Sequence, residues 1–147
     1  MAYPVDKIAN MLLIYSADNG GELMTNMKLQ KMLYYQQGFH LAYFDSPLFE
    51  DDMEAWMYGP VVPSIYEKYK SYGRNGIEPD KTIDFSFDNA NELALFNEVC
   101  NVYCAYSASG LMNMTHDEMP WKSTPTGEGH IIEKEKMRSF FKTRLRE

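Results

Sequence analysis

The fold of this chain is decided by the segment that begins Lys28-Leu29-Gln30-Lys31-Met32-Leu33-Tyr34-Tyr35. Its apolar side chains recur every three or four residues, which is the spacing of one face of an α-helix. Thr25 or Asn26 can cap the start of this helix, and Asp45-Ser46-Pro47 stops it. The inward-facing stripe comprises Leu29, Met32, Leu33, Gln36, Phe39, Ala42 and Tyr43. We therefore expect a long central helix over residues 25–44.

A second informative segment reads Ala55-Trp56-Met57-Tyr58-Gly59-Pro60-Val61-Val62-Pro63. Its first four residues are apolar and predict a short extended piece, in which we expect Trp56 to lie in the core. Gly59-Pro60 predicts a turn. Pro63 fits the first turn of a helix, where no backbone donor is needed, so we expect a helix over residues 64–72.

Helical periodicity accounts for most of the remaining chain. We expect further helices over about residues 4–17, 89–106, 107–114 and 133–145. Apolar and polar residues alternate over residues 83–87, which indicates either an extended segment or a loop held by aromatic side chains. The predicted fold is mainly α, with five to six helices around the central helix and at most a short β ribbon from residues near 52–58 and 83–87. The length of 147 residues and the lack of a long linker predict a single domain over residues 1–147.

The net charge of −7 is unevenly distributed. After residue 132, six basic residues oppose three acidic ones, which gives a local charge of +3 and leaves −10 for the rest of the chain. An acidic body argues against general binding to phosphate backbones and permits electrostatic steering toward a basic protein partner. The basic tail is typical of a solvated helix face.

The beginning of the chain and its cysteines predict a protein of the reducing cytoplasm. Residues 1–7 lack a basic leader followed by an apolar core, and no stretch approaches the ~18 consecutive apolar residues of a membrane helix. Cys100 and Cys104 lie four apart in an expected helix, which favours core thiols over a disulfide framework.

The sequence predicts no metal and no cofactor. The strong ligands available are His40, His116, His130, Cys100 and Cys104, and none has the spacing of a CxxC, HxxxH or HExxH motif. The two cysteines could supply two ligands from adjacent helical turns, whereas structural zinc sites need four. No GxGxxG or GxxxxGK phosphate loop occurs.

No set of side chains predicts an enzyme. A cysteine beside His116 and Asp117 would resemble a nucleophile with its base, but both thiols face an expected apolar stripe, where burial makes them inert. The carboxylates of residues 50–54 are typical of solvated charge. We expect His116 to serve the structure, with Asp117 or Glu118 holding its imidazole ring. An enzyme of unknown class remains a minor alternative.

The chain is rich in the side chains that protein interfaces use. It has 11 Met, 11 Tyr, 8 Phe and 2 Trp residues. Tyr, Trp and Met are enriched at interfaces, although any single one of them is more often a core residue. The excess as a whole favours a binding protein.

A third segment, Thr115-His116-Asp117-Glu118-Met119-Pro120-Trp121, completes a pattern of rare residues in a defined order and spacing. Together with residues 28–35 and 55–63, this segment resembles the family called SocA-like, GepA-like or Panacea domains. The resemblance extends over roughly residues 5–141. Members of that family serve as antitoxins in toxin–antitoxin pairs.

The resemblance implies a protein partner. It predicts that this chain binds a cognate toxin, encoded by an adjacent gene, and neutralises it by occlusion or by delivery to a protease. The domain pairs with toxins of unrelated types, so the resemblance does not name the toxin.

The resemblance also implies a set of partner-binding or motif residues, many of which we expect to maintain the scaffold. They are Lys28, Gln30, Lys31, Tyr34, Trp56, Tyr58, Gly59, Pro60, Val61, Tyr66, Thr115, His116, Pro120 and Trp121. The chain departs from the family pattern at Met57-Tyr58 and in the glycine-containing loop 124–129.

A DNA-binding regulator is the second interpretation, because antitoxins often repress their own promoters. The central helix, residues 55–62 and the helix 64–72 could be arranged as a winged helix, with Lys68, Lys70 and Arg74 near a groove. The net charge of −7 and the lack of a basic recognition helix argue against it. We therefore expect neither nucleic acid nor a membrane as a partner.

Overall fold

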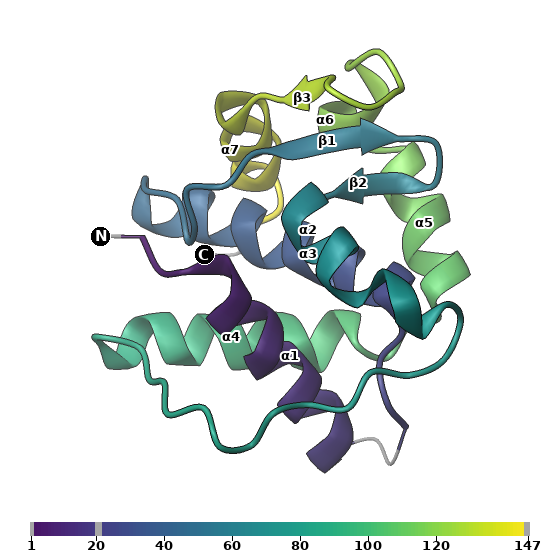
Figure 1. Cartoon of the computed structure of the whole chain (residues 1–147). Helices are drawn as coiled ribbons and strands as arrows, with labels where there is room; N and C mark the ends of the chain where they lie inside the picture. Colours follow the sequence, from purple (N-terminus) through teal and green to yellow (C-terminus); the bar gives the residue numbers. More distant parts are fainter. Residues whose placement is uncertain (1, 20–21, 146–147) are drawn as a thin grey trace.

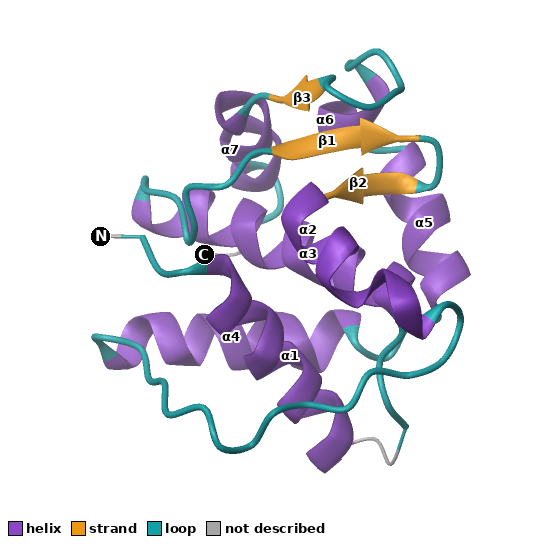
Figure 2. Ribbon diagram, in the orientation of Figure 1, coloured by secondary structure: helices purple, strands orange, loops and turns teal. Residues whose placement is uncertain are grey.

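The computed structural model describes residues 2–19 and 22–145 (Figure 1). This part of the chain is mainly helical, which confirms the predicted fold class, and contains one small antiparallel sheet (Figure 2). The helices are α1 (Val5–Asn19), α2 (Asn26–Phe44), α3 (Pro63–Tyr69), α4 (Ala90–Tyr103), α5 (Ala108–His116), α6 (Met119–Lys122) and α7 (Lys134–Lys142), with a 3-10 turn at Lys70–Tyr72. The strands are β1 (Met53–Trp56), β2 (Gly59–Val61) and β3 (Ile131–Ile132). Besides α2 the described residues contain six α-helices, in agreement with the predicted five to six around the central helix; α6 is a separate single turn with Pro120 near its start.

Helix α2 is the centre of the molecule, as the sequence predicted. Thr25 is its N-cap, with Oγ1 accepting a hydrogen bond from the backbone N–H of Lys28 at 3.3 Å. Asp45 ends the helix in the left-handed conformation, with φ 58°. Helices α1, α3, α4, α5 and α7 and strand β2 all contact α2, so that it is buried on nearly every side. Figure 1 shows the sheet and α4 on opposite sides of α2.

The hairpin turn lies two residues earlier than the sequence predicted. Trp56 pairs with Gly59, so that Met57 and Tyr58 form a two-residue hairpin loop. The expected turn at Gly59-Pro60 is wrong, because both residues belong to β2. Gly59 has φ +115°, a conformation that residues with a Cβ rarely adopt, and this allows the chain to enter β2 directly after the loop.

The third strand also differs from the expectation. The sheet has the order β2-β1-β3, and β3 comes from residues 131–132 and not from residues 83–87. Phe85 and Phe87 instead place their rings edge-to-face on Tyr3, with centroids 5.5 and 5.3 Å apart. The alternation over residues 83–87 therefore reflects a loop anchored by aromatic side chains.

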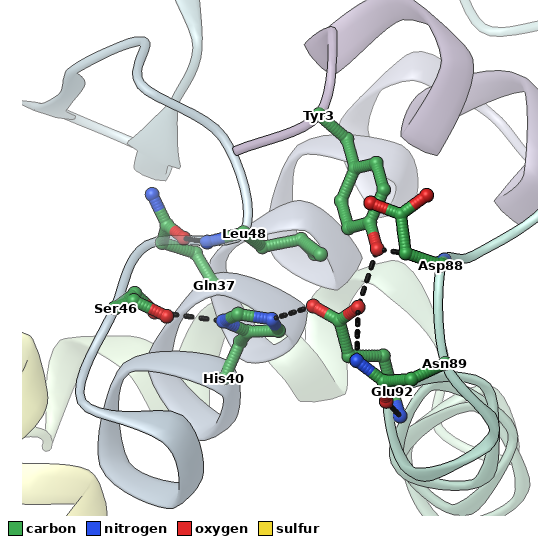
Figure 3. A network of polar contacts seen from close by, with 8 residues as sticks. All are labelled: Tyr3, Gln37, His40, Ser46, Leu48, Asp88, Asn89 and Glu92. Atoms are coloured by element: carbon green, nitrogen blue, oxygen red, sulfur yellow. Dashed lines mark hydrogen bonds and ion pairs between the residues drawn. The ribbon is translucent and has the colours of Figure 1, made fainter. Parts of the chain in front are cut away.

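A buried polar network ties the N-terminal segment to α2 and α4 (Figure 3). His40 lies between the carbonyl oxygen of Ser46, 2.7 Å from Nδ1, and a carboxylate oxygen of Glu92, 2.6 Å from Nε2. The other oxygen of Glu92 accepts hydrogen bonds from the Tyr3 hydroxyl and the Asn89 amide. Burial alone would raise the pKa of Glu92, but the hydrogen bonds from Tyr3 and His40 outweigh it and hold that pKa below its usual value.

No helix in the described part of the chain combines the length and the apolar character needed to span a membrane.

Candidate functional site

The three segments of the sequence pattern meet where the β1–β2 hairpin lies between α2 and the α5–α6 region (Figure 1). We call this region the hairpin junction. It consists of Gln30, Lys31, Tyr34, Trp56, Gly59, Thr115, His116, Glu118 and Trp121. The fold thus brings together residues that are far apart in the sequence.

Gln30 fixes the end of β2 on α2. Its Oε1 accepts a hydrogen bond from the backbone N–H of Val62 at 2.9 Å, and its Nε2 donates to Oδ1 of Asn26 at 2.9 Å. Asn26 in turn donates to the carbonyl oxygen of Tyr66 at 3.2 Å. These buried amides satisfy backbone groups that the short strand and α3 leave unpaired.

Lys31 lies directly beneath Gly59. A Cβ atom on Gly59 would lie 2.3 Å from Cε of Lys31 and 3.1 Å from Oγ1 of Thr115. Lys31 is 1% exposed, and its Nζ donates one long hydrogen bond of 3.4 Å to the carbonyl oxygen of Met27. Over residues 2–19 and 22–145 no carboxylate forms a salt bridge with it. Burial lowers the pKa of Lys31 to about 7, so that much of the amine is uncharged at neutral pH.

Glu118 joins the α5–α6 connection to α2. Tyr34 donates to its Oε1 and Tyr35 to its Oε2, both at 2.9 Å. Burial raises the pKa of Glu118, and the two hydrogen bonds offset part of this effect. Burial also raises the pKa values of Tyr34 and Tyr35 above their usual range, so both hydroxyls remain donors.

Trp56 lies at the surface of the junction and not in the core. Its ring is half-buried, packs edge-to-face on Tyr66 with centroids 5.1 Å apart, and donates from Nε1 to Glu54 at 2.9 Å. The physical reason is the alternation of β1, in which buried and half-buried positions succeed each other and Trp56 occupies a half-buried one. Its carbonyl oxygen accepts a hydrogen bond from Nε1 of Trp121 at 2.8 Å.

His116 stacks on Trp121, with centroids 4.0 Å apart and planes inclined by 20°. The expectation that Asp117 or Glu118 holds the imidazole ring is wrong. Glu118 faces the two tyrosine hydroxyls of α2, and the buried Nε2 of His116 has no hydrogen-bond partner among the described residues. Stacking on Trp121 is therefore the contact that orients the ring.

The remaining predicted residues contribute to the scaffold. Lys28 faces away from the hairpin, and its Nζ donates to the carbonyl oxygen of Cys104 at 2.7 Å. Among the other predicted residues, Tyr66 is half-buried. The buried ones are Pro60, Val61, Thr115 and Pro120. A direct contact between any of these residues and a partner stays a prediction.

Met57 and Tyr58 are the exposed part of the hairpin. Their exposed fractions are 66% and 61%. The two-residue loop presents both side chains to solvent on a base that is buried and hydrogen-bonded. Large apolar side chains on a rigid base suit insertion into a pocket of another protein.

Sequence reasoning missed the hydrogen bond between Tyr35 and Glu118, which lies beside the junction. Both lie inside the quoted segments, but they are separated by 83 positions in the chain. A buried tyrosine hydroxyl needs a hydrogen-bond partner, but Tyr35 lies outside the stripe that the sequence predicts to face inward, so the pattern did not indicate this contact.

Two thiols lie one turn apart on α4, outside the junction. The hydrogen bond between them, together with burial, raises the pKa of Cys100, and the same bond lowers the pKa of Cys104, with help from the charge of Lys28. Nε2 of Gln36 lies 3.4 Å from Sγ of Cys100. In the ranges 2–19 and 22–145, no three or more His, Cys, Asp or Glu side chains gather as metal ligands would.

Comparison with known proteins decides the family. The sequence model of the family described as Antitoxin SocA-like, Panacea domain matches residues 29–122, which include nearly all of the three segments. This chain belongs to that Panacea-domain family. Antitoxin SocA of Caulobacter vibrioides is 36% identical to it over 69 residues, which are 45% of this chain and 35% of the relative. The match thus spans about a third of the length of that curated protein. No solved structure matches the chain.

Proposed function

We propose that this Panacea-domain protein is an antitoxin that binds a cognate toxin directly and thereby blocks it. Membership of the SocA-like family carries the proposal. The exposed loop Met57-Tyr58 on its rigid base supports direct binding, because neutralisation by contact needs a surface and no catalytic group.

We further propose that the loop Met57-Tyr58 is the part of the hairpin that contacts the toxin. Methionine adapts to irregular pockets, and tyrosine supplies a large contact area at a low cost in conformational entropy. Trp56 supports the loop from below through its ring contact with Tyr66. The acidic body of the chain favours a toxin with a basic surface, since opposite charges accelerate encounter.

The test is co-expression with the product of the adjacent gene, followed by purification and titration of the complex. The double substitution Met57→Ala and Tyr58→Ala should weaken toxin binding by about 2 kcal/mol, or roughly 30-fold, without lowering the melting temperature. Ile131→Ala is the matched control, because Ile131 is a 47% exposed apolar residue in β3.

The outcomes separate the two parts of the proposal. Failure to form any complex with the neighbouring toxin would count against the antitoxin function. A complex that the loop variant binds as tightly as the wild type would leave that function standing and remove the hairpin loop from the contact surface.

The same complex distinguishes how neutralisation works. Occlusion predicts that the purified antitoxin inhibits the toxin with no other protein present. Delivery to a protease predicts instead that the toxin is degraded in cells only when the antitoxin is present. A mobility-shift assay with promoter DNA tests the alternative role, in which the protein regulates its own operon. If a shift occurs, its decrease with added salt would measure the number of phosphate contacts.

A further inference from the structure

A groove runs between the C-terminal half of α2 and the outer side of α4. Its volume is about 910 Å³, and its walls include Tyr43 from α2, Leu95 and Val102 from α4, and Leu145 beyond α7. The hairpin contacts α2 from the opposite side to α4 (Figure 1). The groove is therefore a different surface from the loop Met57-Tyr58.

The contribution of α4 to the groove is a helical stripe. The α4 residues that line it stand at positions 91, 94, 95, 98, 99, 102 and 103, which is one continuous face of a helix. A stripe over these positions is about 18 Å long at 1.5 Å per residue. The groove is thus elongated along the axis of α4.

Large apolar side chains remain exposed along this groove. Tyr43 is 57% exposed and Val102 is 46% exposed, one on each wall. Exposed apolar side chains on both walls of a groove suit contact with the apolar face of another element. A third helix packed between α2 and α4 would cover both side chains, because helices pack at axis separations of about 8–10 Å.

Two charged side chains, one acidic and one basic, line the groove at separate positions. Glu98 lies within the α4 stripe, and Arg144 stands near the end formed by the segment after α7. The guanidinium of Arg144 lies over the ring of Phe140, 4.7 Å from its centroid, which holds the charge in place. These opposite charges favour an occupant with a complementary charge pattern and direction.

We propose that this groove binds an amphipathic α-helix of a partner protein, whose apolar stripe covers Tyr43 and Val102 and whose Lys or Arg side chain pairs with Glu98. A helix satisfies its own backbone hydrogen bonds, whereas an added strand would need a sheet edge that neither wall offers. An open channel about 18 Å long also exceeds the compact shape of a small-molecule site. The inference goes beyond the proposed toxin contact and does not depend on it.

Designed peptides test the groove on the full-length protein. The first is a helix of about 18 residues, roughly 27 Å long, with a leucine stripe and one arginine placed to face Glu98. The second carries glutamate in place of that arginine, and the third has the composition of the first in scrambled order. Fluorescence anisotropy should show the first peptide binding about tenfold or more tightly than the scrambled one.

Two substitutions at exposed groove positions and one control complete the test. Val102→Glu should weaken binding of the arginine peptide about tenfold, and Glu98→Lys should reverse the preference between the arginine and glutamate peptides. Ile131→Glu, outside the groove, should change neither. Circular dichroism confirms that each variant is folded.

Three outcomes would overturn the inference. They are equal binding of the scrambled peptide, unchanged binding by Val102→Glu, and an unchanged peptide preference in Glu98→Lys. Light scattering adds a fourth: a dimer of the wild type that Val102→Glu dissociates would assign the groove to a second copy of this chain.

Discussion

The Cε atom of Lys31 occupies the space that a side chain at Gly59 would need. Gly59 can lie against the buried amine because it has no Cβ, and its φ of +115° is the one that the hairpin requires. Two residues of the family pattern that are far apart in the sequence therefore depend on each other, and neither needs to touch a partner.

Gly59→Ala should lower the free energy of unfolding by about 2–3 kcal/mol, because it adds backbone strain and a clash with Lys31. Gly73→Ala is the matched control: Gly73 also has positive φ, but an added Cβ atom there would meet nothing within 4 Å, so its cost should be about 1 kcal/mol. Urea denaturation measures both. Adding Lys31→Ala should recover part of the Gly59→Ala loss, and strictly additive effects would contradict the contact.

Lys31→Met should stabilise the protein, most strongly at neutral and lower pH. The pKa of Lys31 falls from 10.5 to about 7 on folding, so the unfolded chain holds a proton that the folded protein loses. The free energy of unfolding should therefore rise in the wild type from pH 7 to pH 9 by up to about 1.4 kcal/mol per pH unit relative to Lys31→Met. Parallel pH profiles of the two proteins would show that the amine remains charged in the folded state.

Glu92→Gln and Glu118→Gln should destabilise the protein to different extents, although both residues are buried. Glu92 accepts hydrogen bonds from His40 on one oxygen and from Tyr3 and Asn89 on the other, and Gln keeps only one of these two acceptor oxygens, so Glu92→Gln should cost about 2–3 kcal/mol. Glu118→Gln should cost less than about 1 kcal/mol, since it removes a buried charge whose partners are neutral hydroxyls. Thermal melting at pH 7 compares the two, and equal losses would contradict the different environments.

The pH dependence of these two carboxyl groups should also differ in sign. The pKa of Glu92 lies below its ordinary value of 4.5, so its stabilising effect is complete above pH 4.5 and is lost as the pH falls through the lowered pKa. The pKa of Glu118 lies above 4.5, so its burial cost is complete above that raised pKa and is relieved as the pH falls. Acid titration of each Gln variant against the wild type isolates the two contributions.

Cys104 should react with a disulfide reagent about tenfold or more faster than Cys100, because it is half-buried and its pKa is lowered. Cys100 is fully buried and its pKa is raised. Cys104→Ser should abolish the fast phase of thiol release in the folded protein. Cys100→Ala should keep a phase that is slower than in the wild type, since Cys104 loses its hydrogen bond. An unchanged fast phase in Cys104→Ser would contradict the assignment.

The features that could be predicted from the sequence are the extents of single helices and the family pattern. The extent of α2 from Asn26 to Phe44 follows from helical periodicity, the Thr25 cap and the break after Phe44, all of which act over a few residues. The same holds for the start of α4 at Ala90, which lies next to the predicted start at about residue 89. The family is likewise readable from three short segments, and the match over residues 29–122 confirms it.

The contacts between these segments, in contrast, become visible in the folded protein alone. Glu118 could hydrogen-bond to His116 beside it, yet it faces Tyr34 and Tyr35, because α2 brings two buried hydroxyl donors to it from 84 and 83 positions away. Trp56 is half-buried because the pleat of β1 turns it away from the buried face, which Met53 and Ala55 occupy. Such choices depend on desolvation and on partners distant in the chain, which no local spacing encodes.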